Sequence, residues 1–297
     1  MKTILHFARL LLPTVLVAIG DVVSIRAQEV SIPDPSLNAA IREALGIPDG
    51  PLTAPDLLNL TNLDASSRNI SDLTGLESAG NLVTLQLADN QLGTFSFPSN
   101  LVRLTCLDLG ANQLTNAVLP EGLTNLTVLN LQANELTALT LPPGLTGLTS
   151  LALGLNQLTN LTMPADLLNL SVLVLTENQL ADLALPAGLT NLSVLALQAN
   201  QLTTLTLPPD VMNLTTLLLA GNPFTTLVLS EPLAATNLAG SVASLREDGI
   251  SVFTYPLSAQ LVRPRTLTGA FQFGITGPPG FTLSWAPVIS RPGVRWG

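Results

Sequence analysis

Two aspartates occupy equivalent places in this sequence and are its best candidates for chemistry. Asp64 ends the run "LTNLD" and Asp108 ends the run "LTCLD", and the alternation in each run indicates a β-strand. With one strand between them, the two carboxylates would lie about 10 Å apart, at twice the strand spacing. Inverting glycosidases hold an acid and a base at about 6.5–9.5 Å. Residues 98–223 contain no aromatic residue to hold a sugar, so a carboxylate-based glycosidase is the weakest function considered.

The remaining reactive side chains argue against an enzyme. Cys106 is the only cysteine, so no disulfide can form within the chain, and no histidine partner can activate the thiol. His6 and Lys2 are the only histidine and lysine, and both lie in the first 27 residues. Without them the chain lacks the usual general bases, Schiff-base lysines, serine triads and ordinary zinc sites. We therefore expect no catalytic, cofactor-binding or metal-binding residues, and interpret Cys106 as a small residue between neighbouring strands.

Two further motif types have simpler explanations than ligand binding. Asp72, Glu77 and Asp89 carry oxygen atoms suited to calcium, but no D-x-D-x-D spacing supports a site. Seven N-x-S/T sequons occur, which a eukaryotic secreted chain could glycosylate. Those at Asn125, Asn169 and Asn191 are interpreted instead as products of a repeated "NLT" or "NLS".

A 22-residue repeat positions nearly all of these residues. The frame L-x-x-L-x-L-x-x-N-x-L recurs from residue 60 to residue 235, about 60% of the chain. This frame is the signature of leucine-rich repeats. It predicts an α/β-type repeat solenoid, right-handed and curved, with a parallel sheet on its concave side and little helix on its convex side. The eight copies begin at Leu60, Leu82, Leu104, Leu126, Leu148, Leu170, Leu192 and Leu214.

Each position of the repeat has a physical role. In "LTVLNL" (126–131), alternate leucines point into the core, while Val128 and Asn130 point outward. The turn after this strand buries backbone groups, and an asparagine amide can both donate to them and accept from them. A proline follows the last leucine of the outer arm, as at Pro142, so extended or 3₁₀ segments are expected there, and "LTALTL" (136–141) indicates a second short strand. The stacked amides should form an asparagine ladder of Asn90, Asn112, Asn134, Asn156, Asn178, Asn200 and Asn222.

The first repeat needs a cap, because it would otherwise expose its leucines to water. Residues 28–59 are interpreted as this N-terminal cap, with a helix in "IPDPSLNAAIREALG" (32–46). Asp34 suits the N-cap, Pro35 the first turn and Gly46 the C-terminal end of the helix. The apolar face of the helix is expected to comprise Leu37, Ala40, Ile41, Ala44 and Leu45.

The sequence after the repeats departs from the frame. Residues 236–258 are interpreted as a C-terminal cap, with a short helix over 237–247 and a strand over 250–255. Residues 259–297 are interpreted as an incomplete β-rich tail, in which residues 262–285 alternate like strands around a Gly-Pro-Pro-Gly turn. The tail is similar to the opening strands of a β-sandwich, which needs about 100 residues. Residues 286–297 show no strand or helix pattern, which is compatible with a truncated or frame-shifted gene.

The chain resembles the internalin-type surface proteins of bacteria. The resemblance rests on the N-terminal helix, the degenerate first repeat in "LDASSRNISDLTGLE" and the 22-residue period. It implies a secreted or cell-surface module that binds a protein. The "LPxGL" of the outer arm is also similar to repeats of bacterial ubiquitin-ligase effectors, but nothing after residue 235 supplies their cysteine-bearing catalytic domain.

The N-terminus is typical of a secretory signal peptide, here residues 1–27. Basic residues precede an apolar run of 11 residues (10–20), and Ala27 precedes the expected cleavage site, although Ile25 departs from the small-residue rule. Cleavage would remove Lys2, Arg9, Arg26 and Asp21, leaving 8 of the 11 basic and 19 of the 20 acidic residues and a net charge of −11. This charge disfavours nucleic acid and anionic lipid as partners. No other stretch is long enough to span a membrane, so no membrane insertion is expected after cleavage.

One outward strand position recurs in every repeat and forms the candidate binding face. Its first half is polar or acidic and its second half is apolar. We interpret the chain as a monomeric, non-catalytic module that binds a protein on this concave face. The alternative is a structural or adhesive spacer of a bacterial surface, because the central repeats lack the aromatic anchors that dominate protein interfaces. The position is occupied in order by Asp64, Gln86, Asp108, Asn130, Ala152, Val174, Ala196 and Leu218.

Overall fold

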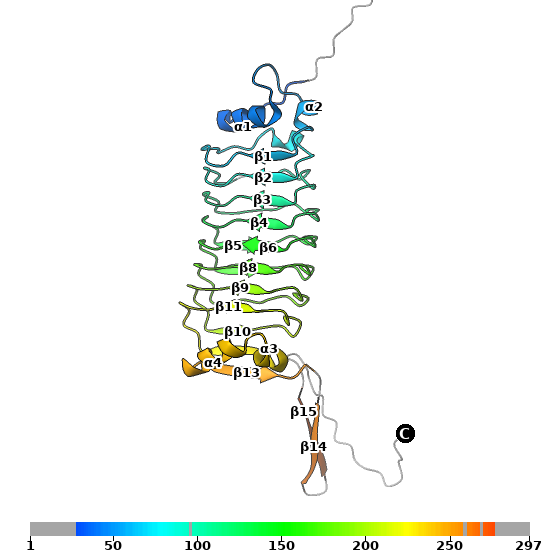
Figure 1. Ribbon diagram of the computed structural model, residues 1–297, viewed down its shortest axis with the longest axis vertical. Coiled ribbons are helices and arrows are strands. Elements are labelled where there is room, and N and C mark those ends of the chain that lie inside the picture. Colours follow the sequence, from blue (N-terminus) through cyan, green and yellow to red (C-terminus); the bar gives the residue numbers. More distant parts are fainter. Residues whose placement is uncertain (1–27, 95–96, 258–259, 268–269, 277–297) are drawn as a thin grey trace, which may run out of the picture.

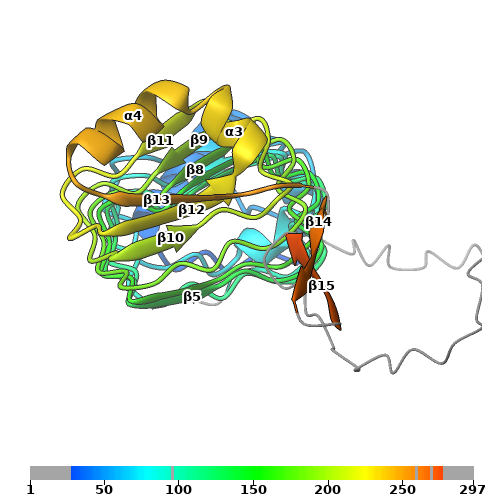
Figure 2. The same cartoon turned by 90° about the horizontal axis from the view of Figure 1, so that it is seen from below.

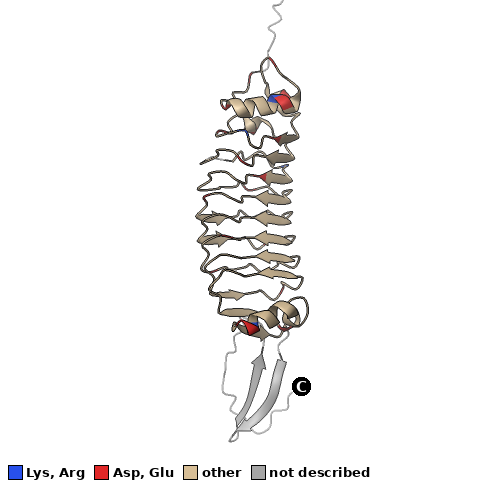
Figure 3. Ribbon diagram, turned by 60° about the vertical axis from the view of Figure 1, so that its left-hand side comes forward, with Lys and Arg blue, Asp and Glu red and all other residues tan. Residues whose placement is uncertain are grey.

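The molecule is a stack of coils with helices at both ends (Figure 1). The computed structural model describes residues 28–94, 97–257, 260–267 and 270–276. The coils follow one another in sequence order along the long axis of the stack. Each coil crosses the stack twice, first as a strand of one long sheet and then as an outer segment (Figure 3).

An eight-stranded parallel sheet, here called the main sheet, runs along one side of the stack. Equivalent residues of successive coils pair, as in Leu107 with Leu129 and Leu129 with Leu151. The leucine period dictates this register, because a slip by one residue would turn the buried leucine to solvent. The solenoid with a parallel sheet that the sequence predicts is confirmed. The strands are β1 (Asn62–Asp64), β2 (Thr84–Gln86), β3 (Cys106–Asp108), β4 (Val128–Asn130), β6 (Ser150–Ala152), β8 (Val172–Val174), β9 (Val194–Ala196) and β11 (Thr216–Leu218).

Short strands also form on the outer side of some coils. β5 (Ala138–Thr140) pairs with β7 (Asn160–Thr162). β10 (Thr204–Thr206), β12 (Thr226–Ser230) and β13 (Ser251–Tyr255) form a second parallel group, which Figure 2 shows across the end of the stack. The third and sixth coils have no outer strand, at residues 116–119 and 182–185, so the outer pairing is interrupted on both sides of the pair β5 and β7.

Leucine side chains fill the space between the main sheet and the outer segments. Leu129, Leu131, Leu136 and Leu148 have no exposed surface, and leucines at the same positions of the other coils are buried in the same way. Burial of one such side chain contributes roughly 1.5–3 kcal/mol. A single coil cannot bury its own leucines, so the coils stabilise one another through their contacts.

Asparagine side chains occupy the turn after the main-sheet strand of the second to eighth coils. Asn156 Nδ2 lies 2.9 Å from the carbonyl oxygen of Leu131 in the preceding coil and 3.1 Å from that of Leu153 in its own coil. Its Oδ1 accepts from the N–H of Leu136 at 3.0 Å. Each amide therefore satisfies backbone groups of two coils and ties them together. The same contacts recur at Asn90, Asn112, Asn134, Asn178, Asn200 and Asn222.

Helices α1 (Pro35–Leu45) and α2 (Ala54–Leu57) cover the first coil, and the 3₁₀ turn η1 (Leu76–Ser78) precedes β2. Asp34 Oδ1 caps α1 by accepting from the N–H groups of Ser36 and Leu37. Its other oxygen accepts from the N–H of Ser71 at 2.9 Å. This second contact joins the helix to the first coil, and no local sequence pattern indicates it, because Ser71 lies far along the chain.

The apolar face of α1 is shorter than the sequence indicates. Leu37, Ala40 and Ile41 are buried, whereas Leu45 is half-buried and Ala44 is exposed. The expectation for Ala44 was therefore wrong. The helix packs on the coil of β1 through its first turns, so its last turn lies outside the interface.

The C-terminal end of the stack departs from the repeat frame earlier than expected. α3 (Glu231–Ala235) occupies residues that were assigned to the outer arm of the eighth repeat, and α4 (Ala239–Glu247) follows it. Pro232 in the first turn of α3 explains the change, because a helix tolerates proline there while a strand interior does not. β13 then adds to β12, and the buried Tyr255 donates its hydroxyl to the carbonyl of Leu207 at 2.7 Å.

An antiparallel hairpin follows the C-terminal cap. Its strands are β14 (Gln260–Leu267) and β15 (Ala270–Thr276). Both strands precede the Gly-Pro-Pro-Gly sequence at 277–280, so they do not flank that sequence as expected. That sequence, the rest of the expected tail and the expected signal peptide (1–27) lie outside the described residues. No described helix is long and apolar enough to cross a membrane.

Candidate functional site

The candidate binding residues form one row across the main sheet. Strand pairing places Asp64 beside Gln86, Gln86 beside Asp108, and so on to Ala196 beside Leu218. Side chains at the same position of adjacent strands lie about 4.8 Å apart and point to the same face. The register therefore brings together all eight residues singled out from the sequence.

The acidic side chains at the polar end of this row stabilise the turns that follow their strands. Asp64 Oδ1 accepts from the N–H of Ser66 at 3.1 Å, two residues further along the chain. Asp108 Oδ1 accepts from the N–H of Gly110 at 2.9 Å and from Asn130 Nδ2 at 2.8 Å. Such Asx turns stabilise the chain where it leaves a strand. A carboxylate two residues before a small residue, as in "DLG", is the sequence signal from which this role could have been read.

These contacts also weigh against catalysis by Asp64 and Asp108. β2 lies between their strands, as the sequence indicates. One oxygen of each carboxylate accepts hydrogen bonds from the protein itself, which suits a structural role better than proton transfer.

The apolar end of the row forms, with the valines that begin β8 and β9, a surface without a charged or aromatic side chain. Val172, Val174 and Val194 are half-buried, Ala196 is 6% exposed and Leu218 is 40% exposed. We call these five residues the apolar strip. Parallel pairing of β8, β9 and β11 makes the strip continuous over three coils. Apolar surface exposed in this way gains free energy when a partner covers it, at roughly 25 cal/mol per Å².

Cys106 lies in the same sheet, at the start of β3. Its side chain is half-buried and pairs across the strands with Thr84 and Val128. Burial, followed by the negative charge of Asp108, raises the pKa of the thiol above its ordinary value. The thiol is therefore protonated at neutral pH, and a protonated thiol is a poor nucleophile.

Among the described residues, no three histidine, cysteine or carboxylate side chains lie close enough to share a metal ion. The carboxylates considered for calcium accept hydrogen bonds from the protein itself. Asp72 accepts from the N–H of Thr74 at 2.9 Å, Glu77 accepts from the N–H of Gly75 at 2.8 Å, and Asp89 accepts from the Ser67 hydroxyl at 2.9 Å.

The sequons contribute to the stacking of the coils. Asn169 Nδ2 donates to the carbonyl of Thr146 at 2.8 Å, and the hydroxyl of Ser171 donates to the carbonyl of Thr149 at 2.9 Å. Both ends of "NLS" therefore bind the preceding coil. Asn125 and Asn191 make the same amide contact, at 3.2 and 2.8 Å.

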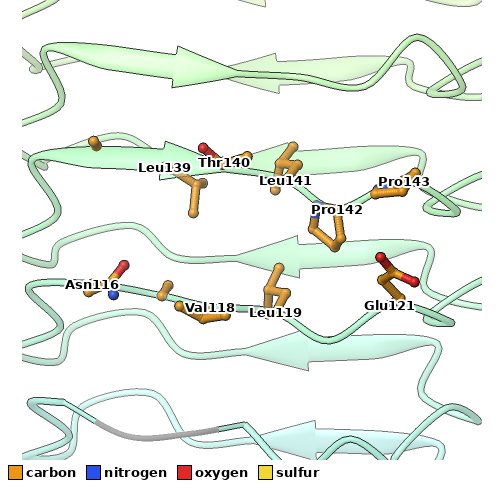
Figure 4. A pocket seen from close by; sticks show the side chains of 11 residues that line it. Asn116, Val118, Leu119, Glu121, Leu139, Thr140, Leu141, Pro142 and Pro143 are labelled. Atoms are coloured by element: carbon orange, nitrogen blue, oxygen red, sulfur yellow. The ribbon is translucent and has the colours of Figure 1, made fainter.

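Pockets on the outer side lie where the outer pairing is interrupted. The larger one, of about 500 Å³, separates residues 116–121 from β5 and the prolines after it (Figure 4). Figure 4 shows Val118 and Leu119 on one edge and Leu139 to Pro143 on the other, with Glu121 as the charged residue at one end. A second pocket of about 320 Å³ lies between residues 182–185 and β10. Both are gaps between coils with few polar side chains, so neither suits catalysis.

Comparison with solved structures relates this geometry to known proteins. The functional domain of InlJ from Listeria monocytogenes matches with a TM-score of 0.52 and 24% identity, over 70% of this chain and 53% of that domain. Internalin C2 of the same bacterium matches with a TM-score of 0.51 and 25% identity, over 71% of this chain and 96% of its own length. This chain has the leucine-rich repeat solenoid fold of these internalins.

The internalin-like solenoid differs from the InlJ domain in two respects. It spans about half, 53%, of the InlJ domain. The InlJ domain includes a cysteine ladder, whereas this chain has a single cysteine. No protein-family model matches the sequence, and no curated protein matches it.

Proposed function

We propose that this internalin-like chain is a secreted or cell-surface binding module that holds a protein partner on the face of the main sheet. The observation that supports the proposal is the apolar strip, in which Leu218 is exposed and the three valines are half-buried. A stack of coils joined by amide ladders is rigid, so the face is preorganised and binding would cost little conformational entropy.

The partner's surface should be complementary to both ends of the row. The apolar strip would meet an apolar patch, and the remaining free oxygens of Asp64 and Asp108 would meet basic or polar groups. Opposite charges accelerate encounter and make binding weaken with salt. The rival function is a structural spacer, which is favoured by the use of polar side chains for stacking in almost every coil.

Photo-crosslinking from two valine positions tests the proposal. A photoreactive residue at Val174 should trap a discrete protein from a surface extract, and excess unlabelled chain should compete with the trapping. The same residue at Val118, which is 66% exposed on the outer side, provides the matched control and should trap no competable partner. Once the partner is known, Val174→Arg should weaken binding at least tenfold and Val118→Arg should not. Equal trapping at both positions, or no trapping at Val174, would contradict binding on this face and favour the spacer function.

A further inference from the structure

Three backbone donors link each coil to the next at the edge of the main sheet. In the fourth coil, the N–H of Leu131 donates to Ala152 and that of Ala133 donates to Gly154, each to a carbonyl oxygen at 2.9 Å. The N–H of Leu136 donates to Oδ1 of Asn156 at 3.0 Å. The same three bonds occur in every coil from the first to the seventh. The terminal sets of donors are Ala65, Ser67 and Ile70 in the first coil and Leu197, Ala199 and Leu202 in the seventh.

The eighth coil has the same donors but no coil after it. They are the N–H groups of Leu219, Gly221 and Phe224, and none of the three has an acceptor within the described part of the chain. β11 is the last strand of the main sheet. α4 covers this end of the stack (Figures 1 and 2), but a helix uses its carbonyls internally and cannot pair with a strand edge. An unpaired N–H away from bulk water costs free energy that an incoming acceptor would recover.

A pocket of about 440 Å³ lies between these donors and α4. Leu219, Gly221 and Phe224 line it on the side of the last coil, and Ser244 and Leu245 line it on the side of α4. Its volume falls within the range of about 300–1,000 Å³ that is typical of ligand sites. The pocket therefore combines mixed walls, in which Ser241 and Asp248 lie beside the apolar residues, with a row of donors that have no acceptor among the described residues.

We propose that this pocket binds an extended peptide that continues the main sheet by one short strand and its turn. The internal coils define the chemistry of the peptide, because they show what the same donors bind. The N–H groups of Leu219 and Gly221 would each donate to a backbone carbonyl, and the N–H of Phe224 would donate to the side-chain oxygen of an asparagine. The matching sequence is Leu-x-Leu-x-x-Asn, in which the carbonyls belong to the residues after the first and the second leucine. Pairing uses the strand edge, so this site is separate from the face assigned to the protein partner.

The probe is a blocked, fluorescently labelled peptide with the sequence of residues 127–136, "TVLNLQANEL". Its anisotropy should rise saturably when the full chain is added. A matched peptide with alanine in place of the asparagine should bind roughly fivefold to hundredfold more weakly, because the two neutral hydrogen bonds that each ladder asparagine makes to the preceding coil are lost. No saturable binding at millimolar chain concentrations overturns the proposal, as does equal binding of the two peptides.

Two variants of α4 and one exchange measurement locate the peptide. Ser244→Trp fills the pocket and should weaken binding at least tenfold, whereas Ala243→Trp, on the same helix and exposed but outside the pocket lining, should leave binding unchanged. At saturation, amide hydrogen exchange at Leu219 and Gly221 should slow at least tenfold. Binding to the Ser244→Trp variant at full affinity, or unchanged exchange at both amides, shows that the peptide lies elsewhere and overturns the assignment.

Discussion

Residues at recurring positions of the coil have distinct structural roles. Six of the seven ladder asparagines are buried and Asn222 is half-buried. Each binds backbone of its own coil and of the preceding coil, while the residues just before them adopt an unusual backbone conformation. Six non-glycine residues before a ladder asparagine have φ between +50° and +56°, and the eighth coil has Gly221 at this place, with φ +78°. The six are Asp89, Ala111, Ala133, Leu155, Glu177 and Ala199.

Asn156→Ala should destabilise the chain more than Gln157→Ala. Asn156 is buried, and its replacement leaves several backbone groups without a hydrogen-bond partner. Each such group costs about 1–3 kcal/mol when it is left unsatisfied. Gln157 is exposed, so its truncation should change stability by less than about 0.5 kcal/mol. Urea denaturation midpoints measure both, and equal midpoints would contradict the structural role of the ladder.

Ala133→Gly should stabilise the chain. At φ +55° the alanine Cβ crowds the following carbonyl, at a cost of about 1–2 kcal/mol that glycine avoids. Glycine also has more freedom in the unfolded chain, so the net gain should be about 0.5–1 kcal/mol. Ala152→Gly, within strand β6, is the control and should be destabilising by a similar amount. Thermal unfolding of the two variants should shift in opposite directions.

At the scale of elements, the N-terminal helix depends on one carboxylate. Burial raises the pKa of Asp34, but hydrogen bonds from the backbone of Ser71, Leu37, Asp72 and Ser36 outweigh it and hold the pKa below its usual value. The charged form is thus favoured in the folded state. Asp34 therefore contributes stability above its unfolded pKa, and this contribution disappears as the pH falls through the folded pKa.

The stability difference between the parent chain and Asp34→Asn should accordingly depend on pH. It should be largest at neutral pH and shrink as the pH falls from about 5 towards 2, because both chains then carry a neutral side chain at the cap. Urea titrations of both proteins at several pH values measure the difference, and the other carboxylates cancel in the subtraction. A difference that stays constant down to pH 2 would show that charge at Asp34 plays no part.

At the scale of the whole molecule, the stack behaves as a one-dimensional array in which each coil contacts its neighbours. Removal of one complete period should preserve every register, whereas removal of half a period should not. The sixth coil is the informative one, because it lacks an outer strand and separates β7 from β10.

Deletion of residues 170–191 should give a chain that still unfolds cooperatively. It brings Asn160–Thr162 beside Thr204–Thr206, so the outer pairing becomes continuous and partly offsets the lost coil. Deletion of residues 170–180 removes half a period and should unfold the chain or reduce its denaturation midpoint severely, since leucines and polar residues exchange faces. Circular dichroism and urea unfolding distinguish the two, and similar behaviour of both deletions would refute the array description.

The candidate site was only partly readable from the sequence. The row from Asp64 to Leu218 follows from the period, because equal spacing forces equal positions into register. The turn contact of Asp108 with Gly110 is local and leaves a signal in "DLG". Its contact with Asn130 is not local and required the register of two coils.

The sequence by itself determined the period, the main sheet, the ladder and the capped helix, because strand alternation, a strict repeat and Asx capping act over a few residues or one period. The tertiary structure alone decided the bond between Asp34 and Ser71, the exposure of Ala44, the helix at residues 231–235 and the open edge beside Gly221. These features arise where the stack ends. There the repeat no longer specifies a residue's neighbours, and packing between distant segments determines which groups are covered and which remain unpaired.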